Sequence, residues 1–205
     1  MRKRVKTAGK LRIAARTRLP TRFGTFSILG IAAGENKDAA VVLQMGRPKA
    51  ARATLVRIHS QCLTGDVFGS QRCDCRGQLE LALRRIARRR EGLLIYLPQE
   101  GRGIGLMNKL MAYQLQDRGM DTVEANRKLG FGADHRDYRL PAAILKLMNI
   151  GRVELLSNNP EKVRQLEENG IEVIRRIPCE TKPSQMTQSY LRTKKEKLGH
   201  LIRYV

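Results

Sequence analysis

A change in the spacing of apolar residues near residue 75 limits the folds that this chain can adopt. Before it, the apolar runs Phe26–Leu29 and Val41–Leu43 have the length and composition of strands, with a turn expected at residues 34–36. Leu55–His59 forms a third short run of the same kind. The N-terminal part is therefore predicted to be mostly β, and the basic residues 1–20 before it are predicted to be irregular.

After residue 75, strand and helix patterns alternate. Leu79, Leu83 and Ile86 recur at helical spacing, which predicts a helix over about residues 77–90. The continuous apolar run 93–97 suits a buried central strand. The same reasoning predicts strands at 153–156 and 171–174 and helices at 106–117, at 142–148 and between Asn159 and Gly170. We therefore predict an α/β fold, a mixed sheet flanked by helices with a mostly β N-terminal part.

Length and charge bound the domain organisation and the partners. A chain of 205 residues fits one domain, which we place at residues 19–205, behind a basic N-terminal tail at residues 1–18. Forty lysines and arginines against nineteen acidic residues give a net charge of +21. Such an excess favours polyanions such as nucleotides or nucleic acid, although most charge runs only solvate a surface.

Neither a membrane span nor a secretory signal is expected. No apolar run approaches the ~20 residues that cross a bilayer, and no long apolar stretch follows the basic residues 2–4. We expect a cytoplasmic protein. In a reducing compartment, clustered cysteines are metal ligands or nucleophiles rather than disulfides.

Three clustered cysteines carry the strongest chemical signal. One residue separates Cys73 from Cys75, and Cys62 lies just beyond the third predicted strand. Catalytic zinc sites use three protein ligands and leave one position for water, whereas structural sites use four. The trio therefore predicts one catalytic zinc ion per chain, at which hydroxide is available near neutral pH. A fourth ligand, from His59 or Cys179, would instead make the site structural, and the sequence leaves both alternatives open.

Two predicted strand-to-helix junctions have the composition of anion sites. Residues 99–105 are rich in glycine, which lets the backbone approach an anion at a helix N-terminus, and Arg102 can add a forked contact. At residues 157–162, Ser157 and Lys162 are candidates to face a phosphate, although a simple helix cap explains this junction equally well.

A polar stretch, Asp134–Tyr138, lies between two predicted helices. Asp134 could orient or deprotonate a neighbour there. A solvated loop with an ion pair is the simpler interpretation of the pattern alone.

Taken together, these motifs resemble the GTP cyclohydrolase II family. The resemblance covers nearly the whole chain after the basic tail and is weaker toward the C-terminus. Several motifs in register are more specific than any one of them. The matching stretches, in the family's order and spacing, are Val56–Asp66, Arg72–Cys75, Gln99–Leu106, Asn126–Phe131, Arg136–Tyr138 and Ser157–Pro160.

The resemblance implies a homodimeric enzyme that commits GTP to riboflavin synthesis. Its products would be formate, pyrophosphate and a diaminopyrimidinone ribosylamino phosphate. Zinc on Cys62, Cys73 and Cys75 would activate water for attack on the guanine carbon that lies between the two imidazole nitrogens. The ring would then open, and formate would leave after a second hydration. Mg²⁺ would accompany the triphosphate.

The resemblance also implies roles for individual residues. Tyr113 matches an active-site tyrosine, Asp134 a proposed general base and Arg136 a proposed nucleophile at the α-phosphate. Arginine stays protonated in proteins, so we interpret Arg136 as a charge stabiliser. Glu100 is expected to accept from the ring and amino N–H groups of guanine. The positions that match nucleotide contacts are Arg57, His59, Ser60, Gln61, Gln78, Glu100, Gly101, Arg102, Thr122, Ser157 and Lys162.

Two positions depart from the family pattern. Gln61 stands where most members carry Glu, and Arg76 stands where most carry Gly, a residue that permits left-handed backbone. An inactive relative is therefore one alternative. A related enzyme that stops at the formamidopyrimidine nucleotide is another. A basic zinc module that binds nucleic acid is a third, not favoured because the chain lacks aromatic clusters for stacking. A dihydroxybutanone phosphate synthase domain, often fused to this enzyme, is not expected in 205 residues.

Overall fold

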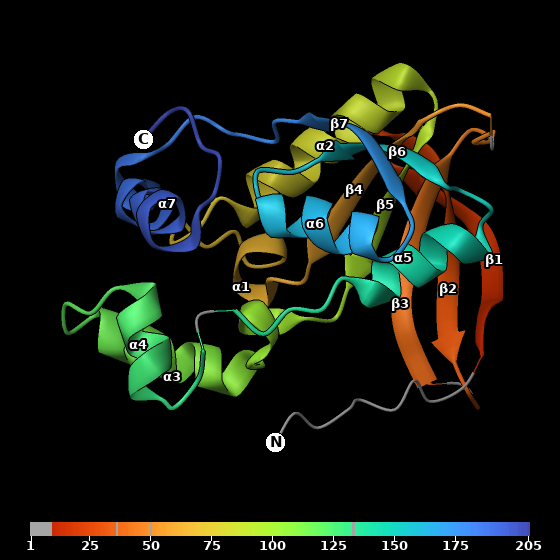
Figure 1. Cartoon of the computed structure of the whole chain (residues 1–205). Coiled ribbons are helices and arrows are strands. Elements are labelled where there is room, and N and C mark those ends of the chain that lie inside the picture. The colour runs from red at the N-terminus through yellow and green to blue at the C-terminus, as the bar shows by residue number, and fades with distance from the viewer. Residues whose placement is uncertain (1–9, 36, 50, 133) are drawn as a thin grey trace.

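The computed structural model describes residues 10–35, 37–49, 51–132 and 134–205. Residues 1–9 of the predicted tail and Asn36 of the predicted turn lie outside these ranges. In the described residues, seven strands form one sheet in the order β1-β2-β3-β5-β4-β6-β7 (Figure 1). The strands are β1 (Leu11–Thr21), β2 (Gly24–Ala33), β3 (Lys37–Met45), β4 (Thr54–Ser60), β5 (Gly92–Leu97), β6 (Arg152–Leu156) and β7 (Glu172–Ile177).

The sheet is antiparallel on one side and parallel on the other. The pairs β1–β2, β2–β3 and β3–β5 are antiparallel, whereas β5–β4, β4–β6 and β6–β7 are parallel. Antiparallel neighbours can be joined by short turns, but parallel neighbours need crossovers, which are usually helical. This division confirms the prediction of a mixed α/β sheet with a mostly β N-terminal part.

Helices cover both faces of the sheet. Successive residues of a strand point to opposite faces, so Leu94 of β5 packs on the side of Leu83 and Ile86, while Leu93 packs on the side of Ile144. The first side is covered by α2 and the second by α5 and α6. The helices are α1 (Leu63–Asp66), α2 (Cys75–Arg89), α3 (Leu106–Gln116), α4 (Thr122–Lys128), α5 (Arg139–Leu147), α6 (Pro160–Glu168) and α7 (Gln185–Leu198), with a 3₁₀ turn η1 (Glu100–Gly103).

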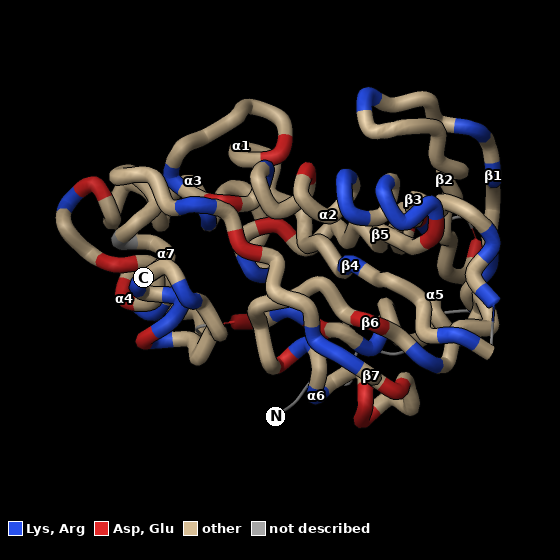
Figure 2. Tube along the Cα trace, turned by 90° about the horizontal axis from the view of Figure 1, so that it is seen from above, with Lys and Arg blue, Asp and Glu red and all other residues tan. Residues whose placement is uncertain are grey.

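The expectation that residues 1–20 are irregular is wrong for residues 11–20, which belong to β1. Its backbone pairs with β2 along the whole strand, from Leu11 opposite Ala33 to Thr21 opposite Gly24. Most of its side chains are exposed, so no burial pattern marks it in the sequence. Figure 2 shows Lys and Arg positions along β1. Basic side chains along such an edge strand oppose pairing with another chain.

Three helices were not predicted: α1, α4 and α7. α1 is too short to show a period, and α4 spans only seven residues. Capping boxes begin α4 at Asp121 and α7 at Ser184. Asp121 followed by Glu124 is a sequence signal that could have located α4, whereas α7 has Thr187 in place of the usual Glu or Gln. α6 begins as predicted, with the Asn159 side chain accepting from the backbone N–H of Glu161.

The parallel strands β4, β5 and β6 end at the same edge of the sheet. The segments that follow them contain Cys62, the glycine-rich turn η1 and Ser157. Ligands of open α/β sheets bind at this edge, beyond the carboxyl ends of the strands. None of the described helices is long and apolar enough to cross a membrane.

Candidate active site

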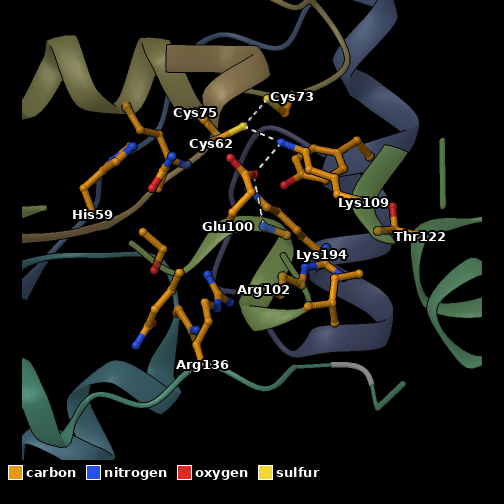
Figure 3. A pocket seen from close by; sticks show the side chains of 18 of the residues that line it. His59, Cys62, Cys73, Cys75, Glu100, Arg102, Lys109, Thr122, Arg136 and Lys194 are labelled. Carbon is orange, nitrogen blue, oxygen red and sulfur yellow. Dashed lines mark hydrogen bonds and ion pairs between the residues drawn. The ribbon is translucent and has the colours of Figure 1, made fainter. Parts of the chain in front are cut away.

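A cavity lies at this edge of the sheet, lined by residues after the strand ends and by residues of α3, α4 and α7. Figure 1 shows these three helices on the same side of the molecule. Among the residues that the structure describes, every predicted site residue except Asp134 lines the cavity. Figure 3 shows the cysteines together with Glu100 and Lys109, and Arg102 and Arg136 in the same pocket. The fold thus gathers side chains that are spread over more than a hundred positions of the sequence.

The three cysteines form the kind of cluster that zinc requires. Their sulfur atoms all lie within 4.8 Å of one another, and Sγ of Cys62 is 3.6 Å from Sγ of Cys73. Tetrahedral zinc with bonds of about 2.3 Å holds its sulfur ligands roughly 3.8 Å apart. The donor set therefore fits a zinc ion with only small adjustments.

Neither alternative fourth ligand joins this group in the described residues. Cys179 is fully buried in the apolar core on the α2 side, and its thiol faces the backbone oxygen of Gln78. The Nε2 atom of His59 lies 3.1 Å from both carboxylate oxygens of Asp66. The arrangement fits a catalytic site with an open position better than a closed structural one.

Gly65 leaves room for the sulfur atoms. A Cβ atom at this position would lie 2.9 Å from Sγ of Cys73 and 3.1 Å from Sγ of Cys62. The contact with Cys73 is shorter than real Cβ atoms show, and the contact with Cys62 is tighter than most of them. The glycine in the first turn after Cys62 is therefore a steric requirement of the cluster.

Lys109, a residue that the sequence analysis missed, lies beside the cluster. Its Nζ atom donates to Sγ of Cys62 at 3.2 Å, to Oγ1 of Thr64 at 2.9 Å and to Oε1 of Glu100 at 2.8 Å. Burial alone would lower the pKa of Lys109, but the hydrogen bond with Glu100 and the negative charge of Cys62 hold it above its ordinary value. The ammonium group is therefore charged and offsets the negative charge of the thiolates.

The thiols do not ionise equally. Hydrogen bonds from Cys73 and Cys75 lower the pKa of Cys62, and the nearby Lys109 adds to this effect. Hydrogen bonding to Cys62 raises the pKa of Cys75, and burial raises it further. Cys62 is thus the first thiolate of the cluster, and a cation is needed before the other two can be charged.

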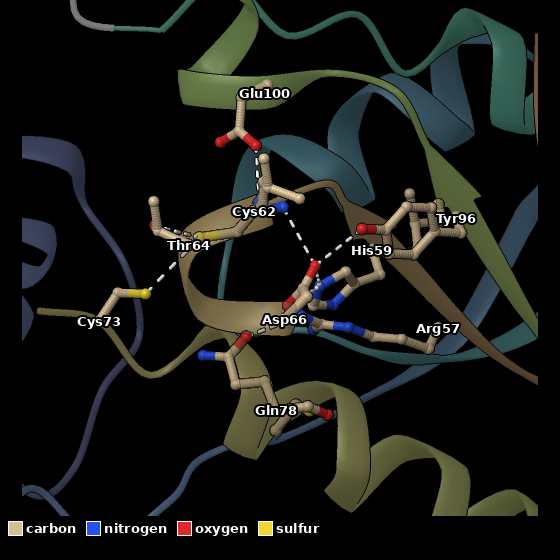
Figure 4. A network of polar contacts seen from close by, with 12 residues as sticks. Arg57, His59, Cys62, Thr64, Asp66, Cys73, Gln78, Tyr96 and Glu100 are labelled. Carbon is tan, nitrogen blue, oxygen red and sulfur yellow. Dashed lines mark hydrogen bonds and ion pairs between the residues drawn. The ribbon is translucent and has the colours of Figure 1, made fainter. Parts of the chain in front are cut away.

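Asp66 is the centre of a second network, which fixes the Cys62 turn (Figure 4). Its carboxylate accepts hydrogen bonds from the backbone N–H of Cys62 at 3.0 Å and from the hydroxyl of Tyr96 at 2.9 Å. The same carboxylate faces His59, whose pKa is lowered mainly by burial. The network orients both the ligand turn and the histidine that lines the cavity.

Cations gather on another part of the cavity wall. Lys162 is buried and donates only to the backbone oxygen of Ile58, at 2.7 Å, among the contacts described. Burial lowers its pKa, and the charges of Arg57 and Arg136 lower it further. Both terminal nitrogens of Arg102 are buried without a hydrogen-bond partner among the described residues. Buried basic side chains without matching anions indicate a polyanionic ligand such as a triphosphate.

Asp134 holds Arg136 from outside the cavity lining. Nε of Arg136 donates to the two carboxylate oxygens at 2.9 Å and 3.1 Å. Although burial opposes it, the hydrogen bond with Arg136 lowers the pKa of Asp134, and this bond also helps to hold the pKa of Arg136 above its ordinary value. Arg136 therefore stays protonated and presents its guanidinium to the cavity, oriented by Asp134. This geometry suits charge stabilisation rather than nucleophilic attack.

Glu100 has less free capacity than its predicted guanine contact requires. Its carboxylate already accepts from Lys109, from the backbone N–H of Leu63 at 2.6 Å and from the backbone N–H of Gly101 at 3.0 Å. A carboxylate has about four acceptor positions. Glu100 cannot take both guanine donors without giving up an internal contact.

Tyr113, Gln61 and Arg76 lie in different parts of the structure. The hydroxyl of Tyr113 lies 3.2 Å from Oγ1 of Thr64, next to the cysteine cluster. Gln61 lines the cavity. Arg76 lies inside the first turn of α2. It is not among the described non-glycine residues that have a positive φ. The idea that Arg76 disturbs a left-handed turn is therefore wrong.

The C-terminal part of the chain also contributes to the cavity, which the sequence analysis did not foresee. Tyr190 and Lys194 of α7 and His200 after it are part of the lining. Lys109 could have been noticed from its spacing with Tyr113, a predicted site residue four positions later in the same helix, because residues at this spacing share a helix face. No comparable pattern marks Lys194.

Comparison with known proteins identifies the family. Residues 12–178 match the family model described as GTP cyclohydrolase II. The chain is 48% identical to a protein named GTP cyclohydrolase-2 from Buchnera aphidicola subsp. Acyrthosiphon pisum, an alignment that covers 94% of this chain and 99% of the relative. It is 50% identical to a GTP cyclohydrolase-2 from Picrophilus torridus, covering 92% of this chain and 97% of the relative.

A third relative is longer. The riboflavin biosynthesis protein RibBA of Bacillus cereus is 51% identical over 90% of this chain, which corresponds to 46% of that protein. This chain therefore matches about half of the longer relative.

Proposed function

The chain belongs to the GTP cyclohydrolase II family, and we propose that its cavity opens the imidazole ring of GTP at a zinc ion held by Cys62, Cys73 and Cys75. The products are formate, pyrophosphate and the diaminopyrimidinone ribosylamino phosphate with which riboflavin biosynthesis begins. The observation that carries the proposal is the position of a three-sulfur cluster in the same cavity as buried, unpaired cations.

A zinc ion held by the three cysteines would lower the pKa of a bound water molecule to near neutral pH. The remaining chemistry falls to the protein. The ring opens when water adds to the carbon between the imidazole nitrogens and the carbon–nitrogen bond breaks. A second water then releases that carbon as formate. Tyr113 and Thr64 lie beside the cluster and can hold the reacting oxygen or the ring nitrogen that takes up the proton.

Arg136, Arg102 and Lys162 face the phosphates in this proposal. A further water cleaves the bond between the α- and β-phosphates, and pyrophosphate leaves. The developing charge on the phosphate oxygens is stabilised by fixed guanidinium groups, of which Arg136 is oriented by Asp134. Asp134 acts by positioning Arg136, because a carboxylate with a lowered pKa is a weak base.

The nucleotide contacts are proposed from the cavity lining. Arg57, Gln78, Thr122 and Ser157 line it, as do His59, Ser60, Gln61 and Gly101. Gln78 and Arg57 are already joined by a hydrogen bond of 2.7 Å. They can therefore act as one polar unit toward the substrate.

Mg²⁺ on the triphosphate is a further part of the proposal, because Mg²⁺ ordinarily binds through the phosphates of a nucleotide substrate. A homodimer is supported by exposed apolar side chains of α3, namely Met107, Leu110 and Met111. A cytoplasmic location is supported by the four free cysteines, since zinc thiolates persist in a reducing compartment.

The test is turnover by the purified, zinc-loaded protein with GTP and Mg²⁺. Mass spectrometry of the nucleotide, together with assays of formate and pyrophosphate, separates the outcomes. Loss of both fragments from GTP supports the proposal. A nucleotide that retains the formyl group would identify the shorter reaction instead. Absence of any ring opening in a folded, zinc-loaded sample would reject both.

A further inference from the structure

The C-terminal helix α7 reaches the zinc turn through one buried ion pair. Nζ of Lys194 lies 2.8 Å from Oδ1 of Asp74, and both residues are less than a tenth exposed. Asp74 is the residue between Cys73 and Cys75. A helix at the end of the chain is therefore tied to the turn that carries two of the three proposed zinc ligands.

The Asp74 side chain does not cap the helix that it precedes. An aspartate at a helix N-cap usually accepts hydrogen bonds from the first backbone N–H groups of the helix. Asp74 is the N-cap of α2, yet its side chain makes no such bond. Its second oxygen instead accepts from the side-chain amide of Gln78. Both carboxylate oxygens thus hold side chains that line the cavity.

The contacts continue from Gln78 into the sheet. Oε1 of Gln78 accepts from Arg57 at 2.7 Å, and Arg57 also donates to the backbone oxygen of Leu156 at 3.0 Å. A continuous polar chain therefore runs from α7 through the zinc turn to β4 and β6. Each side chain in this series is oriented by its hydrogen-bond partners. Displacement of Lys194 would therefore first remove the ion-pair partner of Asp74.

α7 is anchored on both sides of the cavity. Lys197 forms ion pairs with Asp121 and Glu124 at the start of α4. After the helix, the backbone N–H of Leu201 donates to the backbone oxygen of Asn158 at 2.8 Å. Figure 1 shows α7 on the same side of the molecule as α1, α3 and α4. The helix lies outside the residues 12–178 that match the family model.

We propose that α7 is part of the active site and that Lys194 is a positioning residue, which acts through Asp74 to hold Cys73 and Cys75 in place for zinc. The inference rests on the proposed function, because it concerns the same metal site. In this proposal, a residue of α7 near the end of the chain supports the metal site, in addition to the motifs around the cysteines. Partners that orient metal ligands typically affect metal affinity or activity by about 10- to 100-fold.

The experiment compares Lys194→Met with Lys195→Met, a neighbouring lysine of the same helix that is exposed. Two quantities are measured on zinc-loaded protein: the rate at which zinc passes to a chelating dye, and kcat and KM for GTP. We expect Lys194→Met to release zinc about ten times faster and to lose kcat more than KM. Lys195→Met should match the wild type, and Lys194→Arg should restore most of the loss.

Asp74→Asn tests the route. If Lys194 acts through Asp74, the double variant Lys194→Met/Asp74→Asn releases zinc no faster than the more affected single variant. Additive effects of the two substitutions would show that Lys194 does not act through Asp74. Zinc release at the wild-type rate in Lys194→Met would show that Lys194 does not help to hold zinc. If Lys194→Met does not fold, as judged by circular dichroism, Asp74→Asn and Lys194→Gln give the same comparison.

Wild-type protein separates the two proposals. If it binds no zinc and leaves GTP intact, the proposed function fails. If it binds zinc and turns over GTP while the Lys194 variants behave like the wild type, only the role of α7 fails.

Discussion

Gly65 and Cys73 are packed so closely that a single methyl group would not fit between them. A Cβ atom on Gly65 would come within 2.9 Å of the Cys73 sulfur. Gly65 lies in α1, the helical turn that begins directly after Cys62. The same turn therefore positions the Cys62 sulfur and leaves space for the Cys73 sulfur. Gly65 has no side chain that could bind zinc, yet its small size is needed for the proposed metal site.

We predict that Gly65→Ala lowers zinc content more than it lowers stability. The added methyl group pushes Cys62 and Cys73 apart, because both sulfurs lie within 3.1 Å of its position. Elemental analysis of purified protein should show well under one zinc per chain, and turnover should fall in proportion. Gly151→Ala is the matched control, since a Cβ at Gly151 meets no atom within 4 Å. Full zinc occupancy in Gly65→Ala would contradict the packing argument.

Loss of the Lys109 charge should weaken the metal site. In Lys109→Met, the Cys62 thiolate and the Glu100 carboxylate lose their shared cation, and both are largely buried. We expect weaker zinc binding and at least a tenfold loss of kcat, by analogy with other groups that orient metal ligands. Competition with a chelator of known affinity measures the first effect. Lys128→Met, on an exposed lysine of α4, should leave both unchanged.

The strands were predictable because they bury apolar runs. Leu93–Leu97 has all but one residue buried, and its continuous apolar pattern identified β5. β1 escaped prediction because it is held by backbone pairing with β2 while its side chains stay in solvent. Apolar patterns report burial, and a strand without burial leaves no such pattern.

The candidate site was predictable where residues are close in sequence. The cysteine cluster and the glycine-rich turn are local motifs, and the structure places both in one cavity. Lys194 could not be found this way, because 120 positions separate it from Asp74. Glu100 shows the same limit: its type suggested a guanine contact, whereas its hydrogen bonds to Lys109 and Leu63 depend on the fold.

Lys162 should take up a proton when the triphosphate binds. Burial and the charges of Arg57 and Arg136 lower its pKa in the free protein, and a bound polyanion favours the charged form again. At a pH above the lowered pKa, binding of a non-hydrolysable GTP analogue is therefore coupled to proton uptake. Calorimetry in buffers of different ionisation enthalpy measures the number of protons.

The matched variants for this prediction are Lys162→Met and Lys146→Met. The first should abolish the uptake and weaken analogue binding about tenfold or more, since a charge-assisted contact is lost. Lys146 is exposed, and its replacement should change neither quantity. Proton release on binding, or uptake that persists in Lys162→Met, would rule out this residue as the acceptor.

The Asp134–Arg136 pair should stabilise the fold fully above about pH 4 and progressively less as the pH falls further. Its hydrogen bond with Arg136 holds the pKa of Asp134 below the ordinary value of 3.8. The stabilisation is therefore fully present above that value and is lost as the pH falls through the lower pKa of the folded state. Melting temperatures of wild type and Asp134→Asn should differ by a constant amount between pH 5 and pH 8 and converge in acid, as the pH falls through the lowered pKa of Asp134. A gap that closes instead near neutral pH would assign it to another group.

Replacing Arg76 by the family's usual glycine should not improve the enzyme. Arg76 lies in the first turn of α2, where its Nε donates to Glu80 at 3.2 Å, and its backbone needs no glycine. Arg76→Gly should lower the free energy of unfolding by about 0.5–1 kcal/mol, the usual cost of glycine in a helix, and leave kcat unchanged. Arg84→Gly is the matched comparison, because Arg84 lies in the same helix, pairs with the same Glu80 and is distant in sequence from the zinc turn. Urea unfolding and steady-state kinetics on both variants measure the two effects. A rise in kcat for Arg76→Gly alone would show that the arginine strains the turn that carries Cys73 and Cys75.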